Sequence, residues 1–501
     1  MRSGRSGARA APALIALLLA AGCSHAPPAT APKPNPRVER LLTSDLDRIF
    51  GAPWTSNALW GVQVKSLDTG RVLYARNAAT LMMPASNMKI VTLAAAAETL
   101  GWDYRFKTTL ETTAPVEDGV LKGDLIVRGS GDPTINRRDG RAGKVFDEWA
   151  AALKTAGIHR IEGGVLGDGS AFDDRRLGQG WAWDYLEAGY AAPVGALEYN
   201  ENIATVSIRA GAKPGDNAEL QITPGTGLGL LYHVVTGAPG SRTAITLERR
   251  THDNNLDVSG SIAVDAAPVT RDVAVVNPSS YFAQSLLVAL TERGIPVTLT
   301  ARDIADRSPD VEHLPRRVLH ESLSPPLRDI ATTMMKVSQN MYAETLLKAA
   351  GAAKGGPGTA AAGRRASTEV FSAWGIPESW YVQADGSGLS RYDYVTAAMI
   401  VTLLERLHGD PRHREAFVTT LPVAGKDGTI STRMRATRAE GNAVAKTGSI
   451  SNVRALSGYV RTRDGELLAF SILANNFTAP AATINWMADL AVESLANFSV
   501  R

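Results

Sequence analysis

Three short motifs, far apart in the chain, carry side chains that can activate a nucleophile. They are Ser86-Asn87-Met88-Lys89, Ser338-Gln339-Asn340 and Lys446-Thr447-Gly448. Residues three positions apart share one face of a helix, so a helix through the first motif would place Lys89 within reach of Ser86. A serine hydroxyl is a poor nucleophile unless a neighbouring base removes its proton. The first motif therefore predicts a nucleophilic serine with a lysine as its base.

The surroundings of this serine should favour the reaction in two ways. A lysine acts as a base only when it is neutral, and a nearby cation disfavours its charged form. We expect Lys446 to be that cation and also to hold an anionic end of the substrate. The N-terminus of a helix that starts after Pro84 would favour negative charge developing near Ser86. No other lysine of the chain has a serine three residues before it.

The elements that must position these motifs can be read from hydrophobic periodicity and turn residues. A hairpin is expected over Trp60–Asn77, and a helix over Ser86–Leu100 that ends at Gly101. Residues 105–310 contain short strand-like runs between Gly, Pro and Asp turns, with helical patches near Phe146–Ala156 and Phe282–Arg293. Helical periodicity returns at Leu327–Met335, Met341–Gly351, Arg364–Trp374 and Val395–His408. The chain ends with strands at Ala445–Ile450, Leu456–Arg461 and Leu467–Leu473 and a helix at Ala481–Ala496.

This order of elements predicts one α/β domain that is split in the sequence by a large β-rich insertion. A chain of 501 residues is too long for one ordinary core, which fits such a division. We place the first part of the catalytic domain at 38–105, the inserted β-rich region at 106–311 and the second part at 312–501.

The N-terminal residues 1–22 have the pattern of a secretory signal. Three arginines form a positive region, and an apolar run from 10 to 21 follows that is too short to span a bilayer comfortably. Cys23, the only cysteine, then stands where it does in the lipobox of bacterial lipoproteins, although Ala20 replaces the usual leucine. We expect Cys23 to carry a lipid, with 23–37 as a Pro-rich linker. The alternative is an ordinary signal that contains a cysteine.

Composition excludes some classes of function. The 53 basic and 50 acidic residues give a formal net charge of +3, without a dense basic block in the mature part, so nucleic-acid binding has little support. Hydrophobic residues make up 44% and charged residues 21%, which is a globular composition. The eight histidines lack metal-ligand spacing, so we expect no metal and no organic cofactor.

The three motifs together are the set found in β-lactamases and penicillin-binding proteins. The longer sequence resembles the low-molecular-mass class C penicillin-binding proteins, the penicillin-binding protein 4 type. Gln339 is one departure from the family, in which the middle residue of the second motif is often Asp or another polar residue. The matching pieces are Met83–Ser86, Gly123–Val127, Gly129–Pro133, Ala192–Leu197, Asn200–Asn202, Ser324–Leu327, Ser338–Glu344, Asp385–Arg391, Leu421–Gly425 and Lys446–Ile450.

The resemblance implies a penicillin-recognising serine transpeptidase-like domain and a secreted, serine-type D-Ala-D-Ala carboxypeptidase or D,D-endopeptidase. Ser86 would attack the carbonyl between the two terminal D-alanines of a peptidoglycan stem peptide. Lys89 would take the proton of Ser86, and Ser338 would relay a proton to the leaving amine. Water would then hydrolyse the acyl-enzyme, and β-lactams would be covalent inhibitors. We expect the protein in the periplasm or cell envelope, held to a membrane by the lipid.

The resemblance also implies the residues that bind the substrate. Asn340 would hold the amide side of the peptide, and Lys446 with Thr447 would bind its terminal carboxylate. The backbone N–H groups of Ser86 and Ser449 would form the oxyanion hole.

Arg391 follows a Gly/Ser-rich loop, and in the resembled family an arginine at this place lies beside the pocket for a diaminopimelate side chain. Its guanidinium could bind the free carboxylate there through two hydrogen bonds. The alternative is that Arg391 pairs with a nearby carboxylate such as Asp393.

Two other functions remain open from the sequence. A β-lactamase or esterase could use the same serine, and it would deacylate penicillin quickly. A non-catalytic protein of the cell envelope could have kept the scaffold, but the intact Ser86, Lys89, Ser338 and Lys446 argue against it.

Overall fold

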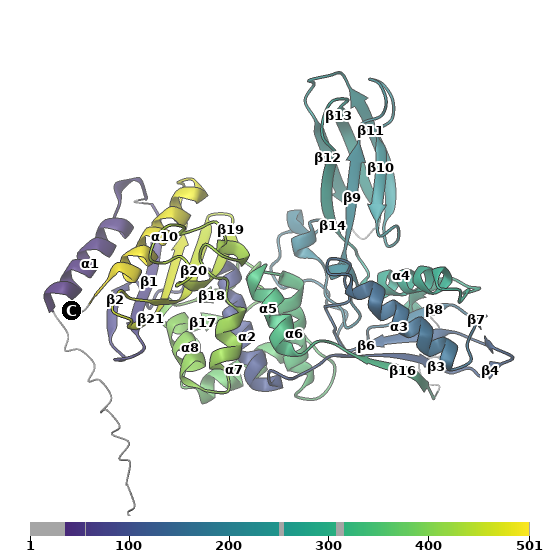
Figure 1. The fold of residues 1–501 in the computed structure, drawn as a ribbon, viewed down its shortest axis with the longest axis horizontal. Coiled ribbons are helices and arrows are strands. Elements are labelled where there is room, and N and C mark those ends of the chain that lie inside the picture. Colours follow the sequence, from purple (N-terminus) through teal and green to yellow (C-terminus); the bar gives the residue numbers. More distant parts are fainter. Residues whose placement is uncertain (1–35, 56, 250–254, 307–314, 500–501) are drawn as a thin grey trace, which may run out of the picture.

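A computed structural model describes residues 36–55, 57–249, 255–306 and 315–499 (Figure 1). The expected signal, Cys23 and the linker up to residue 35 lie outside these described residues. Helix α1 (Pro36–Phe50) begins inside the segment assigned to the linker, so helical structure starts slightly before the boundary that the sequence predicts at residue 38. Within the described ranges, no helix is both long and apolar enough to cross a membrane.

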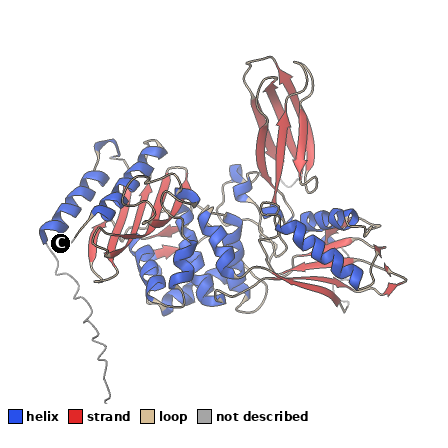
Figure 2. Ribbon diagram, in the orientation of Figure 1, coloured by secondary structure: helices blue, strands red, loops and turns tan. Residues whose placement is uncertain are grey.

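The catalytic domain is built on a five-stranded antiparallel sheet (Figure 2), and its strands come from both ends of the chain (Figure 1). Its order is β19-β20-β21-β1-β2, and β1 pairs with β21 from Leu59 opposite Asn475 to Ser66 opposite Leu468. The expected Trp60–Asn77 hairpin is confirmed as β1 and β2. The strands are β1 (Leu59–Ser66), β2 (Val72–Arg76), β19 (Val444–Ile450), β20 (Val453–Arg461) and β21 (Leu467–Asn475).

Both faces of this sheet are covered, which explains why every residue of β21 is buried. Successive side chains of a strand point to opposite faces. Accordingly, Phe470 lies in the core beneath α1 and α10 (Ala481–Asn497), while Ala469 lies in the core shared with the helices of the other face. The sheet therefore has a helical layer on each side.

The second layer surrounds the nearly apolar helix α2 (Met88–Leu100). Residues 88–97 of α2 are all buried, as expected for a helix without a polar face. This helix contacts α5, α6, α7 and α8. The other helices of the layer are α5 (Leu327–Lys336), α6 (Asn340–Ala352), α7 (Ala360–Ala373), α8 (Ala397–Gly409) and α9 (Arg414–Thr420), with a two-stranded sheet of β17 (Tyr381–Val382) and β18 (Tyr394–Val395).

The inserted region contains a second five-stranded sheet of order β15-β8-β6-β3-β16. Helices α3 (Arg141–Thr155) and α4 (Pro278–Glu292) pack with it around the paired rings of Trp149 and Phe282. The strands are β3 (Lys107–Thr112), β6 (Leu125–Gly129), β8 (Val165–Asp168), β15 (Ala301–Asp303) and β16 (Arg317–Leu323). A small three-stranded sheet joins β4 (Val116–Glu117), β5 (Val120–Leu121) and β7 (Arg160–Ile161).

The boundary of the insertion differs from the sequence-based one at its C-terminal end. Strand β16 pairs antiparallel with β3, although it lies beyond the expected boundary at residue 311. All residues of β16 are exposed or half-buried, so its sequence lacks the apolar run that marks a buried strand. The sheet of the inserted region therefore extends to Leu323.

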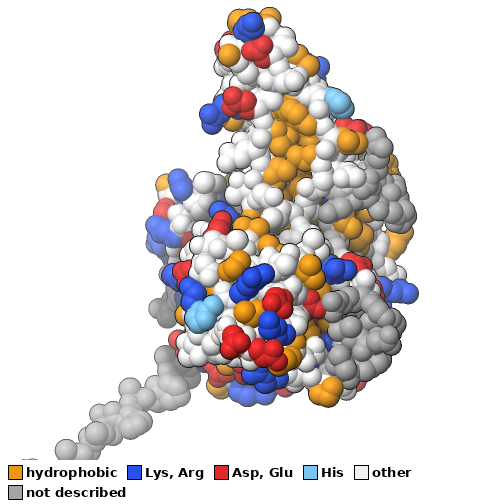
Figure 3. All heavy atoms as spheres, turned by 90° about the vertical axis from the view of Figure 1, so that its right-hand side faces the viewer, with side chains coloured by type: hydrophobic (Ala, Val, Ile, Leu, Met, Phe, Trp, Pro, Cys, Tyr) orange, Lys and Arg blue, Asp and Glu red, His pale blue; other side chains and the backbone are white. Residues whose placement is uncertain are grey.

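A second part of the insertion projects from the molecule as a lobe of two three-stranded sheets (Figure 1). The sheets are β10-β9-β14 and β11-β13-β12, and they share a small core around Val206 and Val258. Hydrophobic side chains gather on one face of this lobe (Figure 3). The strands are β9 (Ile203–Arg209), β10 (Glu219–Thr223), β11 (Gly229–Gly237), β12 (Ala244–Arg249), β13 (Asn255–Ala263) and β14 (Val269–Ala274).

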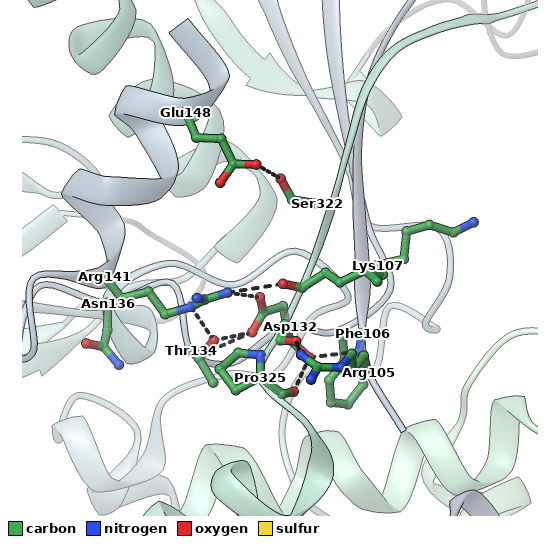
Figure 4. Close-up of polar contacts among 12 residues, drawn as sticks. Arg105, Phe106, Lys107, Asp132, Thr134, Asn136, Arg141, Glu148, Ser322 and Pro325 are labelled. Atoms are coloured by element: carbon green, nitrogen blue, oxygen red, sulfur yellow. Dashed lines mark hydrogen bonds and ion pairs between the residues drawn. The ribbon is translucent and has the colours of Figure 1, made fainter. Parts of the chain in front are cut away.

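The chain passes between the catalytic domain and the insertion at two neighbouring segments (Figure 4). Arg105 donates to the carbonyl of Ser324 over 2.8 Å, and the backbone N–H of Phe106 donates to the Ser324 hydroxyl over 2.9 Å. Arg141, at the start of α3, donates to the Thr134 hydroxyl over 2.8 Å. The two bonds to Ser324 tie the segment that enters the insertion to the segment that returns from it.

Candidate active site

The three motifs meet between α2, α6 and β19. Ser86 lies in a short 3-10 helix (Ala85–Asn87) directly before α2, not in the first turn of the α-helix that the sequence predicts. Strand β19 passes close to this turn: a Cβ on Gly448 would lie 2.6 Å from the carbonyl oxygen of Pro84 and 3.1 Å from the backbone nitrogen of Ser86. Only glycine fits there, so the third residue of the Lys-Thr-Gly motif lets the strand approach the serine.

Lys89 is fully buried and its amine contacts three oxygens. Its Nζ lies 3.0 Å from Ser86 Oγ, 2.6 Å from Asn340 Oδ1 and 2.8 Å from the carbonyl oxygen of Ser387. The spacing within the first motif therefore does bring the amine to the hydroxyl. Asn340 and Ser387 fix the direction of that amine from two other segments.

The pKa of Lys89 is lowered, as a lysine base requires, but the main cause is not the one that the sequence predicts. Burial lowers the pKa of Lys89 to about 7, and the carboxylates of Asp385, Glu344 and Asp393 oppose that shift. The cation expected to lower it, Lys446, is itself buried, and burial together with Lys89 holds the pKa of Lys446 well below its usual value. Desolvation thus makes the neutral amine accessible near neutral pH.

The second and third motifs touch each other through Ser338 and Lys446. Lys446 Nζ donates to Ser338 Oγ and to the carbonyl of Thr447, each over 2.8 Å. Ser338 has a positive φ of 62°, which is uncommon outside glycine. Thr447 donates to the hydroxyl of Thr429 over 2.7 Å, and Ser449 is exposed on the same strand. Hydroxyls and one amine therefore line this side of the site.

A buried loop at residues 385–390 contacts Lys89 through the carbonyl of Ser387. The sequence did not predict this contact. The carboxylate of Asp385 accepts hydrogen bonds from the backbone N–H groups of Gly388 and Ser390 and from the indole N–H of Trp181. Trp181 belongs to the insertion, so this loop joins the two regions. The result is a rigid turn that aims the carbonyl of Ser387 at Lys89.

Two further buried carboxyls hold the same loop. Glu344 accepts from the backbone N–H groups of Gly386 and Ser387, and burial raises the pKa of Glu344 to about 8. Asp393 accepts from the N–H groups of residues 384 and 385, and burial raises its pKa well above the usual value. The available signal for Glu344 was an acidic residue among mainly apolar residues of a helix, four residues after Asn340.

Arg391 lies at the edge of the site, away from the buried acids. Its guanidinium donates to the carbonyl of Ser451 over 2.9 Å. Asp393 is fully buried and bonded to backbone N–H groups, so the alternative pairing of Arg391 with Asp393 is not observed. Across the ranges that the structure describes, no cluster of His, Cys, Asp and Glu side chains could hold a metal ion.

Relatives of known activity match nearly the whole chain. The D-alanyl-D-alanine carboxypeptidase of an Actinomadura species is 36% identical over 492 residues, which cover 95% of this chain and 89% of that protein. The D-alanyl-D-alanine carboxypeptidase DacB of Haemophilus influenzae is 30% identical over 449 residues, covering 88% and 90%.

The fold class is confirmed by solved structures and by a family model. The crystal structure of penicillin binding protein 4 (dacB) from Haemophilus influenzae matches with a TM-score of 0.80 at 26% identity, covering 91% of this chain and 99% of that one. The same protein complexed with a β-lactam matches with a TM-score of 0.71 over 89% and 96%. The model of the D-Ala-D-Ala carboxypeptidase 3 (S13) family matches residues 42–495, so the chain belongs to this family of serine hydrolases.

Proposed function

We propose that this chain hydrolyses the D-Ala-D-Ala bond of peptidoglycan stem peptides through an acyl-enzyme on Ser86. The observation that carries the proposal is the 3.0 Å contact between Ser86 Oγ and the buried Lys89 amine, whose pKa is lowered to about 7. A general base works best when its pKa lies near the working pH. Lys89 meets that condition beside the Ser86 hydroxyl.

Acylation starts when Lys89 Nζ takes the proton of Ser86 as Oγ bonds to the carbonyl carbon of the penultimate D-alanine. The carbonyl oxygen becomes an oxyanion, which the backbone N–H groups of Ser86 and Ser449 stabilise. Such a donor contributes about 3–4 kcal/mol in other hydrolases. The close approach of β19 to the serine turn supports this pairing of N–H groups.

The leaving group departs on the opposite side of the site. Ser338 gives its proton to the amine of the terminal D-alanine as the C–N bond breaks, and the proton that Lys89 took from Ser86 passes to Ser338, which leaves Lys89 neutral again. Lys446 Nζ, 2.8 Å from Ser338 Oγ, keeps its proton and orients that hydroxyl. Lys446 and Thr447 bind the terminal carboxylate, and Asn340 holds the amide side of the peptide. Water then attacks the ester with Lys89 as base, which frees the shortened peptide and returns the proton to Ser86.

The same chemistry serves two substrates, a terminal D-alanine and a cross-linked stem peptide. We infer both a carboxypeptidase and an endopeptidase activity, together with covalent inhibition by β-lactams. The complex of the Haemophilus influenzae relative with a β-lactam supports the last point. Incubation with purified linear and cross-linked muropeptides, followed by mass spectrometry, tests the proposal. Loss of 71 Da without any cleavage of cross-links would restrict the enzyme to carboxypeptidase action, and no product from either substrate would refute it.

The proposed substrate lies outside the cytoplasm, so the chain must be exported to reach it. We infer that residues 1–22 direct this export and that Cys23 carries a lipid that keeps the enzyme at a membrane of the cell envelope. The positive region, the short apolar run and the single cysteine at its end support the inference.

A further inference from the structure

The insertion contacts the catalytic domain along helix α6, which begins at the second motif. Three side chains on successive turns of this helix, or at its cap, bond to acidic residues of the insertion. The pairs are Gln339 with Glu201 at 2.6 Å, Thr345 with Glu198 at 3.1 Å and Lys348 with Asp173 at 2.7 Å. The first of these pairs lies inside the Ser338-Gln339-Asn340 motif, and the third lies more than two turns away from it.

Glu201 is presented by an unusual turn. Residues Asn200, Glu201 and Asn202 have φ values of 50°, 56° and 54°, so three consecutive non-glycine residues are left-handed. The Asn200 amide donates to the carbonyl of Ile203 and the Asn202 amide donates to the carbonyl of Pro193, which hold the turn. Backbone of this kind persists only where its surroundings determine it, and it clusters at functional sites. The turn keeps the Glu201 side chain almost completely buried beside α6.

Gln339 connects Glu201 to the start of α6. Its Oε1 accepts from the backbone N–H of Met341 over 3.0 Å, which caps the helix, while its Nε2 donates to Glu201 Oε2. The neighbours of Gln339 in the motif bond to the two lysines of the site: Ser338 to Lys446 and Asn340 to Lys89. Gln339 therefore links the insertion to both Ser338 and Asn340.

We propose that Glu201 is a positioning residue that holds Gln339 and thereby keeps Ser338 and Asn340 against Lys446 and Lys89. The inference rests on the proposed acylation of Ser86, and it assigns the insertion a part in that step. A second bond from the insertion acts in the same direction, because the Asn340 amide donates to the carbonyl of Tyr190 over 2.8 Å. Ser338, whose φ is 62°, lies in the short segment between α5 and α6 and belongs to neither helix, so contacts of the neighbouring Gln339 help to fix its position.

The first experiment compares Glu201→Ala with Glu201→Gln in the full-length protein. The rate constant for acylation by a fluorescent penicillin is measured below the unfolding temperature, together with the melting temperature. Glu201→Ala should slow acylation on the order of ten-fold, the effect of losing a hydrogen bond to a charged group. Glu201→Gln keeps an oxygen that can accept from Gln339, so it should stay within about three-fold of the wild type. Asp173→Asn is the matched control, since it changes a carboxylate to an amide at the far contact with Lys348.

A second experiment exchanges the two partners. Gln339→Glu places two carboxyl groups at the 2.6 Å contact and should slow acylation on the order of ten-fold or more. Adding Glu201→Gln restores one donor and one acceptor, so the double variant should recover most of the lost rate. Recovery by the exchange shows that the effect of Gln339→Glu acts through its contact with Glu201, and the melting temperatures of both variants separate a change in rate from a change in stability.

Three results would overturn the inference. One is a Glu201→Ala protein that is acylated within two-fold of the wild-type rate. Another is a double variant that is no faster than Gln339→Glu. The third is an equal slowing by Asp173→Asn, which would assign the effect to the general contact along α6. If Glu201→Ala does not fold, the exchange pair decides. Absence of labelling in the wild type would refute the proposed function instead, so the two failures are distinguishable.

Discussion

The amine of Lys89 lies 2.6 Å from the side-chain oxygen of Asn340, although 251 positions separate the two residues in the chain. This contact joins the first motif to the second, and the same amine lies 3.0 Å from Ser86 Oγ. Asn340 thus restricts the Lys89 amine to the position from which it can act on the serine.

The pH dependence of acylation should follow the neutral form of Lys89. Burial lowers the pKa of Lys89 to about 7, so the amine is protonated and inactive below that pH and becomes a base above it. The acylation rate with a penicillin should therefore rise with pH through about 7, fall about ten-fold per unit below it, and level off above it. Stopped-flow labelling between pH 5 and 9 measures this, and a rate that is flat over the range would exclude Lys89 as the titrating base.

Ser86→Ala should abolish covalent labelling by a fluorescent penicillin. The substitution removes only a hydroxyl group, and Ser86 is half-buried in a short turn. The melting temperature should therefore change by no more than a few degrees. Gel fluorescence and thermal unfolding together check both parts. A labelled variant would mean that another residue is the nucleophile.

Gly388→Ala should disrupt the loop under Lys89. Gly388 has a φ of 80°, and a Cβ there would lie 1.8 Å from the carbonyl oxygen of Ala85. The loop would have to move away from the serine turn and take the Ser387 carbonyl with it, and displacements of about 1 Å in an active site can cost on the order of 100-fold in rate. The acylation rate measures the effect.

The matched control for this substitution is Gly375→Ala. Gly375 has a similar φ of 73°, but nothing lies within 4 Å of the added Cβ. It should share the backbone strain, about 1 kcal/mol, and leave acylation nearly unchanged. Equal losses in both variants would show that strain, and not the close approach to Ala85, explains the effect.

Arg391→Ala should lower turnover of diaminopimelate-containing peptides by about ten-fold or more, since a lost charged hydrogen bond costs about 1.5–3 kcal/mol. Acylation by a simple penicillin, which lacks that side chain, should fall much less. The bond from Arg391 to the Ser451 carbonyl offers a competing structural role beside β19. Steady-state rates with both substrates distinguish them, because a structural role would slow both equally.

Cys23→Ser should release the enzyme from the membrane fraction into the soluble fraction of the envelope. The proposed lipid on the new N-terminus would hold the mature chain at the membrane, and a serine in this position cannot carry it. Cell fractionation, with mass spectrometry of the N-terminal peptide, checks this expectation. A wild-type protein that is soluble and begins at another residue would contradict it.

The sequence by itself predicted the pairing of Ser86 with Lys89 and indicated the family. Ser86 and Lys89 lie one helical turn apart, so local geometry alone brings their side chains together. The hairpin of β1 and β2 and helix α6 also followed from local periodicity. These features depend on near neighbours in the chain, which a linear pattern records.

Only the tertiary structure decided how the rest of the site is held. The pKa of Lys89 depends on burial beneath several helices, and the sequence led to Lys446 as its cause instead. Strand β16 joins β3 across the whole insertion, and Glu201 reaches Gln339 from a turn 138 residues earlier. Desolvation and long-range contacts arise from the packing of distant segments, and periodicity within one segment carries no record of its distant partner.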